Sequence, residues 1–103
     1  MRSVILAALA IVLFACLPHV NTVYYPFVWD DVHFVVDNPA VLELQAPARY
    51  FTDPQTLSSN PDYNQKIYRP LRTLSFALIH TAVGLNPAVY HAVNIILHVM
   101  CAL

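Results

Sequence analysis

Charged residues are scarce in this chain. Its 103 residues include five Lys or Arg and six Asp or Glu, and the formal net charge is −1. A nucleic-acid-binding surface requires a concentration of basic residues, so the sequence predicts no nucleic-acid partner. The mean hydropathy of +0.55 is high for a soluble domain.

Glycine and cysteine are nearly absent. The single glycine, Gly84, follows a helical pattern and is placed to end that helix. The two cysteines, Cys16 and Cys101, each lie inside an apolar run, where cysteine behaves as a small buried hydrophobe. Their placement indicates neither a disulfide nor a metal-binding pair.

The chain is short, and its last residues have an unusual pattern for a C-terminus. Residues 88–103 are helical in pattern and mostly apolar, and they end without a cap, a charge or a turn residue. A helix of these sixteen residues rises by roughly 24 Å, less than the roughly 30 Å of a bilayer core. We therefore expect a truncated piece of a longer membrane protein.

The first apolar run, Val4 to Leu17, admits two interpretations. It is short for a spanning helix and typical of a signal-peptide core. In one interpretation, residues 1–20 form a first transmembrane helix. In the other, the segment is cleaved, and residues 13–16 resemble a lipoprotein cleavage box ending at Cys16. A second apolar segment later in the chain favours the retained helix, and Arg2 then places its N-terminus in the cytoplasm.

Residues 21–69 form the predicted outer loop, on the periplasmic or lumenal side. The loop holds all six acidic residues. An aromatic run at residues 24–29 is typical of a membrane interface. Asn38 and Pro39 predict a turn, or a helix with Asn38 as its N-cap. Nothing in the loop predicts a compact core of its own.

Two helical patterns follow the loop. Residues 70–85 begin at Pro70 and have an apolar face, which predicts an interfacial helix. Residues 87–103 begin after Asn86-Pro87 and predict a second, truncated transmembrane helix. His91, Asn94 and His98 form a polar stripe on one side of it, which indicates interhelical hydrogen bonds. No third ligand at short spacing completes a zinc site there.

The adjacent acids Asp30 and Asp31 are the candidate catalytic residues. They lie just outside the first apolar segment, directly after Trp29. One could act as a general base on an acceptor hydroxyl, and the other could hold a divalent cation or orient a basic partner. The alternative is a solvated turn or a helix cap.

Arg69 and Arg72 are candidate phosphate-binding residues. A guanidinium at a membrane surface can bind the phosphate of a lipid or of a lipid-linked substrate. The alternative is interfacial anchoring, in which the stem lies in apolar surroundings and the charge reaches water.

Five motifs in this order resemble a known family. The series is similar to the N-terminus of GT-C type membrane glycosyltransferases with C-terminal tetratricopeptide repeats, which include the transmembrane and tetratricopeptide-repeat O-mannosyltransferases. The motifs are residues 27–31 (FVWDD), 37–41 (DNPAV), 68–76 (YRPLRTLSF), 84–87 (GLNP) and 90–98 (YHAVNIILH).

The resemblance implies a function. In that family, a polytopic helical domain transfers a sugar from a polyprenyl-phosphate carrier to a hydroxyl of a protein or glycan on the non-cytoplasmic side. The family's catalytic acid pair maps onto Asp30 and Asp31, and Arg69 would lie near the donor phosphate. The later spanning helices and the repeats lie beyond these motifs, so the 103-residue chain is expected to be inactive alone.

The predicted fold is thus an all-α membrane protein fragment, with two transmembrane helices joined by an outer loop containing short helices. The short first segment and the compact loop are typical of a bacterial inner membrane. A different class of function remains open, namely a small non-enzymatic two-helix membrane protein or a lipoprotein.

Overall fold

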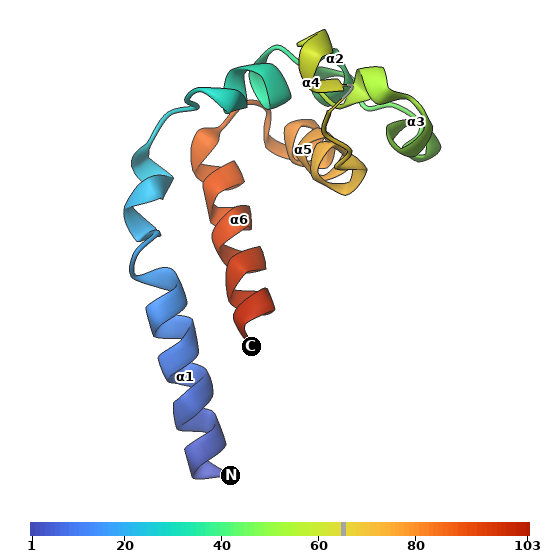
Figure 1. Ribbon diagram of the computed structural model, residues 1–103. Coiled ribbons are helices and arrows are strands. Elements are labelled where there is room, and N and C mark those ends of the chain that lie inside the picture. Colours follow the sequence, from blue (N-terminus) through green and yellow to red (C-terminus); the bar gives the residue numbers. More distant parts are fainter. Residues whose placement is uncertain (65) are drawn as a thin grey trace. The chain divides into compact units, whose positions relative to one another are not determined.

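A computed structural model of the chain describes residues 1–64 and 66–103, in which helices are joined by turns and irregular segments, without strands (Figure 1). The all-α prediction is confirmed. The elements in chain order are α1 (Arg2–Cys16), η1 (Val20–Tyr24), η2 (Val32–Val36), α2 (Pro39–Leu42), α3 (Pro47–Thr52), η3 (Pro54–Thr56), α4 (Pro61–Asn64), α5 (Pro70–Val83) and α6 (Pro87–Ala102).

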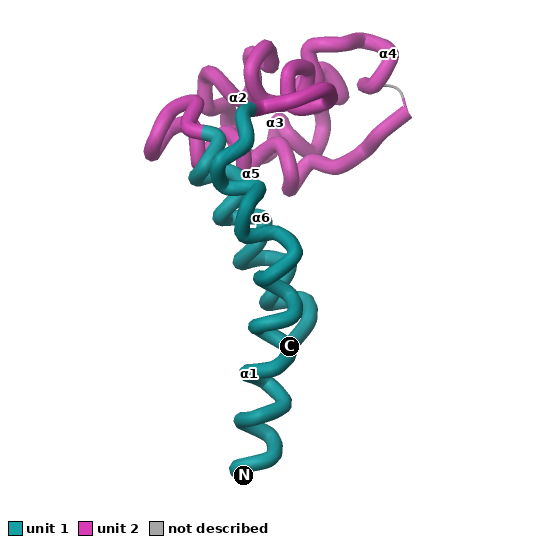
Figure 2. The backbone as a smooth tube through the Cα atoms, turned by 90° about the vertical axis from the view of Figure 1, so that its left-hand side faces the viewer, with its two compact units in different colours: residues 1–26, 87–103 teal, residues 27–86 magenta. Residues whose placement is uncertain are grey.

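The chain divides into two compact units. Met1–Pro26 and Pro87–Leu103 form unit 1, and Phe27–Asn86 form unit 2 (Figure 2). In unit 1, α1 and α6 lie side by side and run in opposite directions, and η1 also packs on α6 (Figure 1). None of the helices within the described residues combines the length and the apolar character needed to cross a membrane.

Helix α1 is shorter than the helix expected over residues 1–20. It has 15 residues, and the N–H of Leu17 still donates to the carbonyl of Leu13. Pro18 lacks the N–H that would continue this ladder, so the helix cannot extend regularly through it. A 3₁₀ turn, η1, follows at Val20–Tyr24.

Unit 2 has a small core of its own, which the sequence did not predict. Helix α5 packs against α2 and α3. Ala40, Tyr50 and Ala77 are buried at this junction, and Leu74 packs against them. The Tyr50 hydroxyl donates to the carbonyl of Ala40 at 2.7 Å and accepts from the N–H of Gln45 at 3.0 Å. The loop therefore folds on α5, which belongs to the same unit.

Asn38 connects the short elements of unit 2. Its side-chain oxygen accepts from the N–H of Ala40 and caps α2, with Pro39 at the first helical position. Its amide nitrogen donates to the carbonyls of Phe34 and Thr56, at 3.3 and 3.0 Å. The helix start expected at Asn38-Pro39 is confirmed, and the side chain also joins η2 to η3.

Helix α5 begins at Pro70, as expected, and its C-cap is Gly84. Gly84 has φ +70° and ψ −151°, a backbone region that only glycine adopts without strain. The inward side of α5 carries Thr73 and Ala77, both fully buried. Leu71 and Leu78 remain exposed on the outer side.

Candidate acid–arginine site

The acid pair lies at the start of a short helical segment. The N–H of Asp31 donates to the carbonyl of Val28 at 3.0 Å, and the N–H of Val32 donates to that of Trp29 at 3.2 Å. The π-helical turn η2 follows, closed by the N–H of Asp37 on the carbonyl of Val32. The two carboxylates are therefore held on a hydrogen-bonded turn.

The two acids have different surroundings. The Asp31 carboxylate accepts the N–H of Val28 at 3.2 Å, so it is turned back onto its own chain. This is the arrangement in which an acid three residues into a helix caps the N–H at the helix start. Asp30 is exposed and interacts electrostatically with Arg72. The two adjacent acids thus have different partners.

Arg72 lies in the first turn of α5. Its guanidinium carbon is 4.0 Å from the centre of the Phe34 ring, a cation–π contact. Its Nε and Nη2 atoms are buried and have no hydrogen-bond partner among the described residues. A charged group left with unpaired donors is costly in isolation, and this makes Arg72 a candidate for binding an anion.

The charges around Arg72 act in opposite directions. Burial lowers the pKa of Arg72, and the neighbouring Arg69 lowers it further, whereas the Asp30 carboxylate raises it. Arg69 is the N-cap residue of α5, where the helix dipole adds positive potential. We refer to Asp30, Arg69 and Arg72 as the acid–arginine cluster. It has one carboxylate for two guanidinium groups.

Not all of the predicted site residues interact with one another. Asp30 and Arg69 both act on Arg72, whereas Asp31 is occupied by Val28. Arg72 was one of two candidate arginines in the sequence, and its spacing of three from Arg69 placed both near one helix start. No sequence signal connected Phe34 to Arg72, because the contact joins segments 38 residues apart.

The residues of the polar stripe have separate surroundings in unit 1. The His98 ring contacts the His19 ring edge-on, with centroids 5.2 Å apart. The Nε2 atom of His91 is buried without a hydrogen-bond partner among the described residues, and Asn94 is exposed. In the part of the chain that the structure describes, no three His, Cys, Asp or Glu side chains converge as metal ligands.

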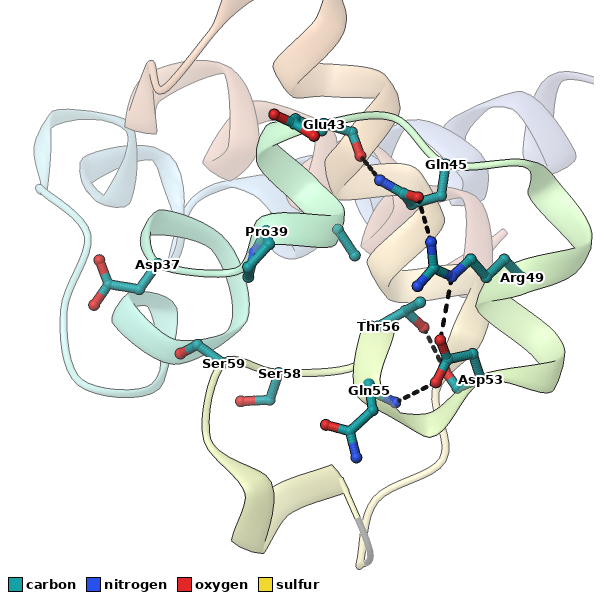
Figure 3. Close-up of a pocket in the computed structure, with 11 residues that line it drawn as sticks. Asp37, Pro39, Glu43, Gln45, Arg49, Asp53, Gln55, Thr56, Ser58 and Ser59 are labelled. Carbon is teal, nitrogen blue, oxygen red and sulfur yellow. Dashed lines mark hydrogen bonds and ion pairs between the residues drawn. The ribbon is translucent and has the colours of Figure 1, made fainter.

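A pocket of about 370 Å³ opens elsewhere on unit 2 (Figure 3). Asp37, Glu43, Arg49 and Asp53 are among the residues that line it. The Arg49 guanidinium lies between Gln45 and Asp53 and donates to both, at 2.8 and 3.1 Å. The sequence did not predict this pocket.

Most polar groups at that end of the pocket already bind one another. Asp53 also accepts the N–H of Gln55 at 3.0 Å, and this bond, followed by the contact with Arg49, lowers the pKa of Asp53. The Thr56 hydroxyl donates to the Asp53 carbonyl at 2.8 Å. These contacts connect α3 to η3. The side chains that form this wall of the pocket therefore have a structural role. Neither Asp30 nor Arg69 lines the pocket.

Comparison with known proteins identifies relatives of the chain. Human protein O-mannosyl-transferase TMTC1 is 39% identical over 94 residues, which cover 86% of this chain and 10% of the relative. Mouse protein O-mannosyl-transferase TMTC2 is 37% identical over 81 residues, covering 78% of this chain and 10% of the relative. A protein O-mannosyl-transferase of Caenorhabditis elegans is 32% identical over 99 residues, covering 92% and 14%.

Other comparisons give no match. No protein-family model matches the chain, and no solved structure does. The chain spans about a tenth of the length of the human and mouse relatives, so it aligns with one segment of each. The resemblance seen in the five motifs is confirmed, and the chain belongs to the family of TMTC-like protein O-mannosyl-transferases.

Proposed function

We propose that the chain is part of a membrane glycosyltransferase that moves mannose from a polyprenyl-phosphate donor to a hydroxyl group of a protein. The sugar and the protein acceptor follow from the names of the relatives, and the donor follows from the resemblance to GT-C enzymes. The observation that carries the proposal is the buried guanidinium of Arg72, which lies over the Phe34 ring and interacts electrostatically with the exposed Asp30 carboxylate and with Arg69.

Asp30 is the general base in this proposal. Its carboxylate takes the proton of the acceptor Ser or Thr hydroxyl, and the hydroxyl oxygen attacks the anomeric carbon of the donor sugar. The bond from that carbon to the phosphate oxygen breaks, and the lipid phosphate leaves with the electron pair. The attack comes from the side opposite the phosphate, so the configuration at the anomeric carbon is inverted. The exposure of Asp30 leaves it accessible to an acceptor.

Arg69 and Arg72 stabilise the leaving phosphate in this proposal. Negative charge develops on the phosphate oxygens as the bond breaks, and a preorganised cation nearby lowers the barrier to that step. The cation–π contact with Phe34 holds the Arg72 guanidinium in place. This contact does not occupy the hydrogen-bond donors of the guanidinium. Binding of Nε or Nη2 by a phosphate requires a local shift of the covering side chains, because both atoms are buried.

The proposed site lies at the non-cytoplasmic face of a membrane, with residues 21–69 outside and α1 and α6 in contact with lipid. Large apolar side chains on these helices support the lipid contact, among them Leu6, Phe14 and Met100, which are all exposed. The bacterial inner membrane remains a sequence prediction for the location.

Transfer of mannose tests the proposal. The protein is expressed, and membranes are assayed with a polyprenyl-phosphate mannose donor and a Ser/Thr-containing acceptor protein. Asp30→Asn keeps the size of the side chain and removes the base, so transfer is expected to fall by about a hundredfold or more. Asp62→Asn, an exposed acid in α4 outside the cluster, is the matched control and should transfer at the unmodified rate. Equal rates for both variants would refute the assignment.

A further inference from the structure

The turn that carries the acid pair contains a strained residue. Trp29 has φ +49°, a left-handed backbone conformation that is rare and costly for a side chain of this size. The Trp29 side chain is 90% exposed, so packing against neighbours contributes little to holding it in place. The strain must therefore be balanced mainly by the hydrogen bonds of the turn itself.

Two hydrogen bonds close the turn between Val28 and Asp31. The Asp31 N–H donates to the Val28 carbonyl at 3.0 Å, and the Asp31 carboxylate accepts the Val28 N–H at 3.2 Å. Both join the same two residues and enclose Trp29 and Asp30 between them. The carboxylate bond is the one that depends on the identity of the side chain at position 31.

The position of Asp30 depends on this closure. Asp30 directly follows Trp29, so a return of Trp29 to a negative φ would redirect the chain at Asp30 and move its carboxylate. General-base catalysis requires the base within hydrogen-bond reach of the proton that it takes, and small displacements cost large factors in rate.

We propose that Asp31 is a positioning residue, whose carboxylate holds the Val28–Asp31 turn closed and keeps Trp29 in its strained conformation, so that the chain at Asp30 keeps its position. The proposal rests on the proposed function, in which Asp30 is the base. It separates the roles of the two adjacent acids: Asp30 reacts, and Asp31 supports the geometry through its hydrogen bond rather than through its charge.

Three variants separate the hydrogen bond from the charge. Asp31→Asn keeps an oxygen that can accept the Val28 N–H but removes the charge. Asp31→Ala removes both. In the double variant Asp31→Ala/Trp29→Gly, glycine adopts φ +49° without steric cost, so the turn can close without the carboxylate. Trp29→Gly alone is the control for loss of the indole.

The first readout is hydrogen exchange at the Val28 amide, which needs no enzymatic activity. We expect Asp31→Ala to speed this exchange by roughly tenfold, because the bonded N–H becomes free, and Asp31→Asn to leave it within about twofold. Unchanged exchange in Asp31→Ala would overturn the proposal, since the carboxylate would then not hold the turn.

The second readout is mannose transfer, measured as kcat/KM. We expect a loss of roughly tenfold in Asp31→Ala, substantial retention of transfer in Asp31→Asn, and partial recovery in the double variant relative to Asp31→Ala. Equal losses in Asp31→Asn and Asp31→Ala would overturn the proposal, because the charge of Asp31 would then be what matters. Failure of the proposed function is distinguishable, since it would show as full transfer by Asp30→Asn whatever the Asp31 variants do.

Discussion

At the scale of single residues, neighbours in space decide what chemically equal side chains do. Asp30 and Asp31 are adjacent and identical, yet the Asp30 carboxylate is exposed and interacts electrostatically with Arg72, whereas the Asp31 carboxylate caps the Val28 amide. Arg69 and Arg72 likewise differ, because Arg72 is half-buried over Phe34 while Arg69 is exposed. These differences in surroundings distinguish the roles of the two acids and of the two arginines. The residue types alone do not.

Arg72 is expected to contribute to mannose transfer and to add little to the free energy of unfolding. Arg72→Met keeps an unbranched apolar stem over Phe34 and removes the buried donors that have no partner among the described residues. The free energy of unfolding should therefore fall by no more than about 1 kcal/mol, or rise, while mannose transfer is lost by about tenfold or more. Urea denaturation followed by circular dichroism, together with the transfer assay, measures the two effects. A variant that unfolds readily and loses transfer in proportion would indicate a structural residue instead.

Asn38 is expected to be a main structural residue of unit 2. It is fully buried, and its side chain makes three hydrogen bonds to backbone groups. Asn38→Ala leaves those groups unpaired and should lower the free energy of unfolding by about 3 kcal/mol. Denaturant titration measures the change. Asn60→Ala, which removes one exposed cap to the N–H of Asp62, is the matched control and should cost about 1 kcal/mol or less.

At the scale of elements, the ends of the helices follow from local sequence, and their packing does not. Asn38-Pro39, Pro70 and Asn86-Pro87 predict helix starts because capping and the fixed φ of proline act within a few residues. Gly84 predicts a helix end for a similar local reason. The core of unit 2 escaped prediction, since Tyr50 reaches Ala77 only after α3 has folded onto α5.

In the candidate site, too, the sequence predicts local features but not the contacts between distant segments. The acid pair and Arg69 were identified by type, motif and placement along the chain. Their arrangement depends on contacts between distant segments, above all that of Arg72 with Phe34, which no periodicity encodes. The strained turn at Trp29 was also unpredictable, because a non-glycine residue with positive φ is rare and carries no sequence signature.

The connection between α3 and η3 is expected to weaken in acid. The pKa of Asp53 is lowered from its ordinary value of 3.8, first by the bond from the Gln55 N–H and then by Arg49. A lowered folded-state pKa means that the ionised form stabilises the fold. This contribution is fully present above about pH 4 and is lost as the pH falls through the folded-state pKa.

Comparison of Asp53→Asn with the unmodified chain measures this contribution. The difference in the free energy of unfolding should be largest above about pH 4 and should shrink toward zero at lower pH. It should also shrink in high salt, because Arg49 is exposed. A difference that stays constant from neutral to acid pH would show that the charge of Asp53 contributes nothing.

At the scale of the whole molecule, the two units are suited to different surroundings. Unit 1 pairs two apolar helices with many exposed aliphatic side chains, whereas unit 2 carries all six acidic residues and the acid–arginine cluster. This division agrees with the proposal that unit 1 meets lipid and unit 2 meets the sugar donor and its acceptor.

The most direct test of this account compares Asp30→Asn with Asp62→Asn in mannose transfer from a polyprenyl-phosphate donor to a protein hydroxyl. The account predicts that transfer falls by about a hundredfold or more in the first variant and is unchanged in the second, with both variants equally folded. Transfer at the unmodified rate by a well-folded Asp30→Asn variant would contradict it.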